Sequence, residues 1–213
     1  MKTGKKLRDI YDRLFAAFGP QHWWPGESAL EVAVGAILTQ NTNWGNVEKA
    51  IGNLREEGLL DVQRLYRLSR GDLARLIRPA GYFNIKAARL KNFVEFLVAD
   101  YGGSLSIMKR ADETTVRRNL LSVKGIGPET ADSIMLYALD KPVFVIDAYT
   151  KRVLSRHNIM GQDSSYGDFQ GLFHSSLKRD KIMYNEYHAL LVRLAKEHCR
   201  TKPLCGGCPV GGM

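Results

Sequence analysis

Apolar residues recur three or four positions apart along most of this chain, and no stretch alternates convincingly between apolar and polar residues as a half-buried strand would. We therefore predict an all-α fold of many short helices joined by tight turns. A first helix is expected to end at Gly19-Pro20, with its apolar face formed by Leu7, Tyr11, Leu14, Phe15 and Phe18. Ser28 is the expected N-cap of a second helix, and Glu31 would complete a capping box.

The same periodicity predicts further helices along the rest of the chain. They cover residues 46–57, 61–67, 71–77, 83–100, 112–121, 128–138, 147–156, 165–175 and 179–197. Segment 141–146, KPVFVI, is β-branched but short, so we interpret it as a buried connector rather than a strand. A length of 213 residues is enough for one large domain or two small ones with a real core.

The formal net charge of +9 favours a polyanionic partner, most simply a nucleic acid, although a merely basic soluble protein has the same balance. No run of apolar residues reaches the ~18 that a membrane span needs. The basic N-terminus is interrupted by Asp9 and Asp12, so we do not interpret it as a signal peptide. We expect a cytoplasmic protein.

Two glycines, Gly125 and Gly127, lie in a short loop between two predicted helices. Such a tight turn needs residues free to adopt unusual backbone angles, which both glycines would supply, and Ile126 between them would anchor the loop in the core. With no side chains in the way, the next helix could present its first N–H groups to a phosphate. An ordinary turn between helices is the alternative interpretation.

Asp147 comes twenty residues after Gly127, at the end of the apolar connector and the start of the next predicted helix. A carboxylate in this place is most often an N-cap. However, the order of hairpin, helix, apolar connector, aspartate and basic helix forms a recognisable whole.

Residues 120–153, LLSVKGIGPETADSIMLYALDKPVFVIDAYTKRV, resemble the helix–hairpin–helix segment and catalytic aspartate of the endonuclease III superfamily of DNA glycosylases. Segments 33–51 and 77–90 resemble two further blocks of that family, in the family's order. The resemblance implies an all-α, two-domain fold with the active cleft between the domains. One domain would comprise residues 1–25 and 141–213, and the other residues 26–140, with the hairpin at about 112–138.

The resemblance also implies a hydrolase that acts on double-stranded DNA carrying a damaged base. We expect a monomer associated with the nucleoid. The alternatives are an endonuclease III-like glycosylase and lyase with another damaged base as substrate, and a non-catalytic helix–hairpin–helix DNA-binding protein.

Glu129 occupies the position at which the bifunctional members have a lysine that attacks the sugar C1′ and forms a Schiff base. A carboxylate cannot form a Schiff base, and Lys124 lies on the other side of the hairpin. The resemblance therefore implies a monofunctional glycosylase that uses water as the nucleophile. Asp147 would stabilise the positive charge that develops on the deoxyribose and orient or deprotonate the water.

The stretch His22-Trp23-Trp24-Pro25, followed by LTQNTNW at 38–44, resembles the 3-methyladenine branch of the superfamily. A 3-methylated adenine is already a flat cation, which aromatic faces recognise by stacking and cation–π attraction. The resemblance implies a base pocket formed by Trp23, Trp24, Pro25 and Trp44. Tandem tryptophans that simply pack in a core are the alternative.

Further DNA contacts follow from the same resemblance. Gln40 would insert into the gap left by the flipped base, and Tyr82 would wedge against the opposite strand. Phosphate contacts are expected from Lys124, Gly125, Gly127, Lys151 and Arg152. Ordinary surface or packing roles explain Gln40 and Tyr82 as well, and a solvated helix face equally explains Lys151 and Arg152.

All three cysteines lie in the last fifteen residues, in the pattern Cys199-x5-Cys205-x2-Cys208. This pattern resembles the [4Fe–4S] loop of the superfamily, in which a fourth cysteine would fall at position 214, one past the last residue of the sequence. The first gap is one residue shorter than in endonuclease III, and some members of the 3-methyladenine branch lack the cluster. A zinc site completed by His198 is the rival interpretation. Arg200 and Lys202 in this loop would contact DNA.

Overall fold

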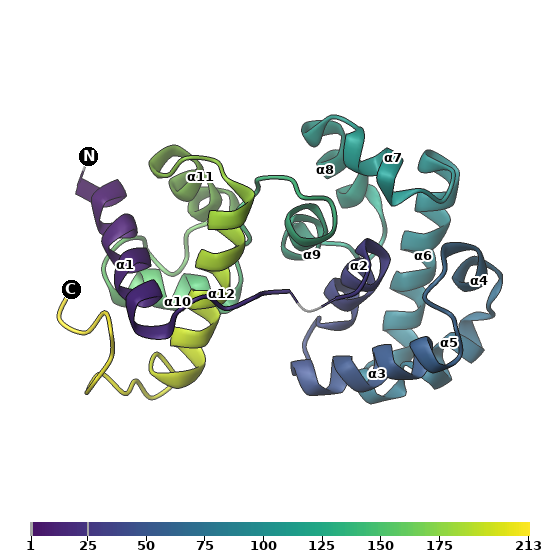
Figure 1. The fold of residues 1–213 in the computed structure, drawn as a ribbon, viewed down its shortest axis with the longest axis horizontal. Coiled ribbons are helices and arrows are strands. Elements are labelled where there is room, and N and C mark those ends of the chain that lie inside the picture. The colour runs from purple at the N-terminus through teal and green to yellow at the C-terminus, as the bar shows by residue number, and fades with distance from the viewer. Residues whose placement is uncertain (1, 25) are drawn as a thin grey trace. The chain divides into compact units, whose positions relative to one another are not determined.

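The structure is a computed structural model that describes residues 2–24 and 26–213, and every regular element in those ranges is a helix. The chain divides into two compact units. One comprises Met1–Trp24 and Pro142–Met213, and the other comprises Pro25–Lys141. Figure 1 shows the helices of each unit by label and by position along the chain. The predicted all-α fold is confirmed.

The unit over Pro25–Lys141 is built around one buried helix, α2 (Ala29–Leu38), whose residues 30–38 are all buried. Helix α2 packs against α3, α6 and α9, which Figure 1 labels, and against the short element η2. The other helices of this unit are α3 (Trp44–Glu56), α4 (Val62–Arg67), α5 (Arg70–Leu76), the 3-10 turn η1 (Arg78–Ala80), α6 (Phe83–Tyr101), α7 (Leu105–Arg110), α8 (Glu113–Ser122), α9 (Pro128–Ser133) and the π-helical turn η2 (Ile134–Ala138).

Lys86 stabilises the centre of this unit although it is a charged residue. Its side chain is buried, and Nζ donates 2.7 Å hydrogen bonds to the carbonyl oxygens of Leu38 and Ala80. Both carbonyls lie at helix ends, where backbone acceptors have no partner within the helix. Burial and the nearby Arg89 charge lower the pKa of Lys86 to about 8.

The other unit consists of α1 (Lys2–Phe18), α10 (Ala148–Arg156), α11 (Tyr166–Ser176) and α12 (Lys181–Glu197). Helix α12 packs against α10 and α1. The core is aromatic: the rings of Phe144 and Phe173 stack 3.6 Å apart, and the edges of Tyr184 and Tyr187 meet the ring of Phe144. The segment KPVFVI supplies Phe144 and contains no strand, so the predicted buried connector is confirmed.

Three local predictions differ from the structure. Helix α7 was not foreseen, although Ser104 caps it by accepting the N–H of Ile107. The single helix expected over 128–138 is divided into α9 and η2. Ser28 does cap α2, but Glu31 does not complete a box, because its carboxylate pairs with Arg55 Nη2 at 2.6 Å.

Candidate active site and DNA-binding elements

The two glycines of the hairpin between α8 and α9 differ in what the backbone requires of them. Gly125 has φ of +96°, and a Cβ at this position would lie 2.4 Å from Cγ of Arg89. Gly127 instead has an extended backbone, φ −93° and ψ 179°, which any residue can adopt. The expectation that both glycines supply unusual backbone angles is therefore wrong for Gly127. A Cβ there would meet no described atom within 4 Å, so this glycine leaves the loop surface bare.

A buried ion pair fixes the two helices of the hairpin to each other. The Asp132 side chain on α9 is fully buried, and Arg117 on α8 donates to it through Nε at 2.8 Å and Nη2 at 3.0 Å. This two-pronged geometry is the strong form of the arginine–carboxylate contact. Ile126, which is 4% exposed, anchors the loop between the helices as predicted.

Gln40 is brought to the same hairpin. Its Nε2 donates to the carbonyl oxygen of Gly125 at 3.2 Å and to Oγ1 of Thr130 at 2.8 Å, while Arg89 donates to its Oε1. The sequence grouped Gln40 with the DNA contacts but did not identify Arg89 or Thr130 as its partners. Lys124 is exposed on the loop, and its carbonyl oxygen accepts from Asn92.

In the other unit, Asp147 is the N-cap of α10. Its Oδ1 accepts the Thr150 N–H at 2.7 Å, and its Oδ2 lies 3.5 Å from Nε2 of His188 on α12. The N-cap interpretation is thus confirmed, and the side chain remains 13% exposed. The capping role uses one carboxylate oxygen, so it does not exclude a chemical role for the group.

The surroundings of Asp147 act in opposite directions on its pKa. Burial raises the pKa of Asp147, because an ion in the interior loses water. Coulombic attraction to His188, together with the hydrogen bond from the Thr150 backbone N–H, outweighs burial and holds the pKa of Asp147 below its usual value. Asp147 is therefore a carboxylate, not a carboxylic acid, at neutral pH. His188 was missed by sequence reasoning, and its one sequence signal is a lone histidine at the start of the apolar run HALLV.

The proposed base-pocket residues belong to different units. The rings of Trp23 and Trp24 lie 5.7 Å apart at 76° in one unit, whereas Trp44 opens α3 in the other. Pro25 lies outside the described residues. Trp44 lines a hollow of about 420 Å³ and donates through Nε1 to Glu48 at 2.7 Å. The full lining is Gly26, Glu27, Glu31, Trp44, Glu48, Ile51 and Arg55.

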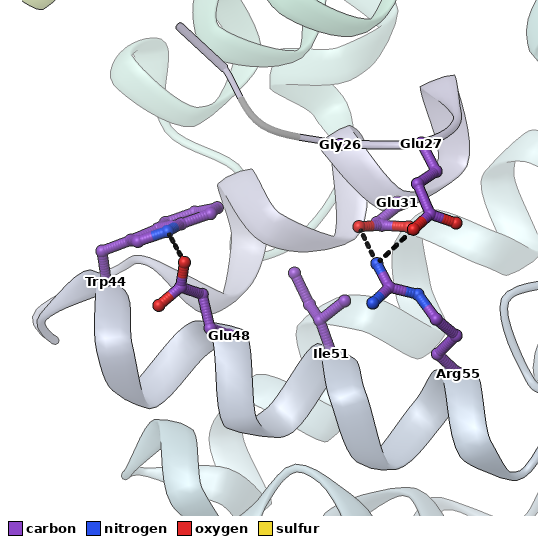
Figure 2. Close-up of a pocket in the computed structure, with 7 residues that line it drawn as sticks. All are labelled: Gly26, Glu27, Glu31, Trp44, Glu48, Ile51 and Arg55. Carbon is purple, nitrogen blue, oxygen red and sulfur yellow. Dashed lines mark hydrogen bonds and ion pairs between the residues drawn. The ribbon is translucent and has the colours of Figure 1, made fainter.

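This hollow is acidic, although the whole chain is basic. Figure 2 shows Arg55 reaching the carboxylates of Glu27 and Glu31, at 3.5 Å and 2.6 Å, while Glu48 lies at the Trp44 indole. The lining of the hollow therefore contains three carboxylates and a single guanidinium. An aromatic face surrounded by excess negative charge favours a cationic ligand over an anionic one.

The remaining residues predicted to contact DNA differ in their exposure and in the hydrogen bonds that they already make. Tyr82 is 68% exposed at the start of α6, with φ of 46°. Lys151 donates to the Ser164 carbonyl oxygen, and Arg152 donates to the carbonyl oxygens of Cys199 and Ala195. Each cation keeps further N–H donors beside these bonds, so a phosphate contact from either would use those donors or replace such a bond.

The three cysteines do not converge on a common centre in the structure. Cys199 is buried and its Sγ accepts from Arg156 at 3.4 Å, whereas Cys205 is exposed and Cys208 half-buried. Over residues 2–24 and 26–213, no group of three cysteine, histidine or acidic side chains is arranged to hold a metal ion. Neither the iron–sulfur set nor the zinc set with His198 is therefore assembled by the residues present. Within the same ranges, no helix has the length and apolar character of a membrane span.

Comparisons with known proteins agree with these elements. The model of the HhH-GPD superfamily of base excision DNA repair proteins matches residues 34–179, more than half of the chain. A candidate DNA repair glycosylase of Methanocaldococcus jannaschii is 48% identical over 213 residues, which cover 99% of this chain and 97% of that protein.

Two solved structures extend the comparison. The Helicobacter pylori 3-methyladenine DNA glycosylase MagIII bound to 1,N6-ethenoadenine is similar with a TM-score of 0.77 and 25% identity, over 92% of this chain and 97% of that one. A non-covalent endonuclease III–DNA complex shares the fold with a TM-score of 0.82 and 20% identity, over 98% and 94% of the two chains. With its hairpin and Asp147 both inside the matched segment, this chain belongs to the HhH-GPD superfamily of base excision repair DNA glycosylases.

Proposed function

We propose that this glycosylase is monofunctional and hydrolyses the N-glycosidic bond of alkylated purines such as 3-methyladenine. The observation that carries the proposal is Asp147, which is ionised and held at a helix N-terminus. In the first turn of α9, Glu129 would, by the family resemblance, take the place of the lysine of the lyases. The similarity to a 3-methyladenine glycosylase at 25% identity supports the substrate class.

In the proposed reaction, the bond from C1′ to the base breaks first and its electron pair leaves with the base. A 3-methylated adenine leaves as a neutral molecule because it is cationic while bound, so no strong general acid is needed. The Asp147 carboxylate stabilises the resulting oxocarbenium-like sugar, since preorganised opposite charge acts strongly where water is excluded. Asp147 also orients the water whose oxygen bonds to C1′ and accepts its proton.

The proposal assigns recognition of the cationic base to aromatic faces. Trp44 is supported by its position in the acidic hollow, where Glu48 holds the indole and excess negative charge favours a cation. Trp23, Trp24 and Pro25 remain proposed pocket residues on the strength of the resemblance. For the DNA backbone we propose Lys124, Gly125 and Gly127 at the hairpin, Lys151 and Arg152 on α10, and Tyr82 and Gln40 as the residues that wedge into the duplex.

The proposal does not include an iron–sulfur cluster. The described cysteines do not form a three-ligand group, and no step of the reaction requires one. The cluster stays a prediction of the family resemblance alone.

Base release from a panel of duplexes tests the substrate class. We expect excision of 3-methyladenine and 7-methylguanine, and little or none of uracil, oxidised pyrimidines or mismatched bases, because only the methylated purines carry positive charge before the bond breaks. Release of free base is measured by chromatography at excess enzyme. Excision of oxidised pyrimidines without methylpurines would show an endonuclease III-like enzyme instead, and no excision of any base would favour a DNA-binding protein without activity.

Borohydride trapping tests the monofunctional assignment. We expect no covalent complex between the wild-type protein and abasic-site DNA, because Glu129 has no amine and Lys86 is buried between two carbonyl oxygens. Glu129→Lys should form a trapped complex visible by denaturing gel, and Glu129→Gln, the matched neutral control, should not. Trapping of wild type as efficiently as of Glu129→Lys would identify a lyase.

A further inference from the structure

His188 contacts the carboxylate of Asp147 from a different helix. It lies in the middle of α12, is 5% exposed, and places Nε2 3.5 Å from Oδ2 of Asp147. The other oxygen, Oδ1, accepts the Thr150 N–H of α10. The two oxygens of the Asp147 carboxylate are therefore contacted from two helices, α10 and α12, which pack against each other.

These two contacts restrain the Asp147 side chain more than a single N-cap hydrogen bond would. A single N-cap bond satisfies the first turn of α10 and leaves the plane of the carboxylate free to tilt about it. The imidazole adds a second point on Oδ2 and so limits that tilt. At 3.5 Å the contact is long for a hydrogen bond, so its effect is chiefly electrostatic. His188 itself is buried and acts through Asp147.

We propose that His188 is a positioning residue for glycosidic-bond hydrolysis, which holds the Asp147 carboxylate ionised and oriented toward the sugar. The inference rests on the proposed catalytic role of Asp147. The same contact also explains why the pKa of Asp147 is low although the group is largely buried, because burial alone would raise it.

Several other charged groups on the packed helices contact partners other than Asp147. On α10, Lys151 donates to the Ser164 carbonyl oxygen and Arg152 to those of Cys199 and Ala195. On α12, Glu186 accepts from the Gln21 backbone N–H. The Tyr187 hydroxyl, also on α12, donates to the Leu7 carbonyl oxygen of α1, and the acidic group that acts on Tyr187 is Asp12 of α1. Thr150 and His188 are the groups that lower the pKa of Asp147.

Two substitutions separate the donor function of His188 from its ability to carry a proton. His188→Phe keeps a flat ring but removes both. We expect the single-turnover excision rate at neutral pH to fall about 10- to 100-fold, the scale on which an opposite charge within ~4–6 Å favours an ionised group. His188→Gln keeps an N–H donor and should retain most of that rate. DNA affinity should change in neither variant, since His188 is buried.

The pH dependence of the excision rate distinguishes a positioning role of His188 from a merely structural one. A residue that only stabilised the fold would not change this pH dependence when replaced. Loss of the imidazole raises the pKa of Asp147 toward its value in isolation, so the acidic limb of the rate profile should move to higher pH in both variants. His174→Gln is the matched control, because His174 is another histidine of the same unit and accepts the Phe144 N–H through Nε2. It should change thermal stability and leave the limb in place.

Each outcome decides the inference. A wild-type rate and pH profile in His188→Phe, with Asp147→Asn inactive, overturns the role of His188 and leaves the proposed function standing. Full activity of Asp147→Asn overturns both. If His188→Phe does not fold, His188→Gln carries the test: an unmoved acidic limb in that variant rejects the inference, and a limb at higher pH with a near-wild-type neutral rate supports it.

Discussion

Asp147→Asn is expected to lose base release by a factor on the order of 10² to 10³, the scale on which removal of one preorganised electrostatic group acts. Asparagine has nearly the same shape and is an equally good N-cap, so its side-chain oxygen can still accept the Thr150 N–H. What disappears is the negative charge opposite the developing oxocarbenium ion. The measurement is single-turnover release of methylated purine, with thermal unfolding and DNA affinity as checks on folding and binding.

Asp112→Asn is the matched control for this substitution. Asp112 caps α8 by accepting the Thr115 N–H at 2.8 Å, so it is also an N-cap aspartate that bonds a threonine N–H three residues later. It should keep wild-type turnover because it lies on another helix and has only a capping role. Near-wild-type turnover by Asp147→Asn would remove Asp147 from the chemistry and return it to the role of a cap.

Acid should narrow the difference in stability between wild type and Asp147→Asn. The pKa of Asp147 is lower in the folded state than in the unfolded chain, so its ionised form contributes stability that is complete above the usual aspartate pKa. That contribution is lost as the pH falls through the folded pKa, where the carboxylate becomes protonated and resembles the amide. A lower pKa also predicts that turnover persists to moderately acidic pH.

The elements that sequence predicted well are those with local causes. Helix periodicity identifies most helices, and Ser28 and Asp147 cap α2 and α10 because the residue three positions later presents its N–H to each side chain. The bend at Gly125 has a local cause too, because a residue without a Cβ adopts its positive φ easily. Such features depend on a few neighbouring residues, which a single sequence displays.

The features that sequence did not predict join residues far apart in the chain. His188 meets Asp147 only because α12 packs on α10, and Arg89 meets Gln40 only because α6 packs against α2. Glu31 was expected to reach back to its own N-cap, but the packing of α3 against α2 offers it Arg55. A local rule cannot weigh a tertiary partner, and here a guanidinium replaced a backbone N–H. The acidic character of the hollow beside Trp44 was hidden for the same reason.

Arg117→Met should have the largest effect on stability, because it leaves the Asp132 carboxylate buried without its cation. Removing one partner of a buried ion pair costs about 3–5 kcal/mol of unfolding free energy, and the 32% exposure of Arg117 places this pair near the lower end of that range. Urea unfolding measures the loss. Since the pair joins α8 to α9, DNA affinity should fall with it if the hairpin carries the backbone contact.

Two further variants separate this buried pair from ordinary surface charge. Arg75→Met removes the cation of an exposed pair with Asp72 and should cost less than about 1 kcal/mol, as exposed pairs do. The double variant Arg117→Met/Asp132→Leu removes both charges and should recover much of the loss, because the penalty comes from burying the Asp132 charge without the Arg117 cation rather than from a missing attraction. If the double variant were as unstable as Arg117→Met alone, the hairpin would depend on the geometry of the ion pair itself. If the double variant regained stability but bound DNA weakly, the Arg117–Asp132 pair would serve mainly to position the hairpin loop rather than to stabilise the fold.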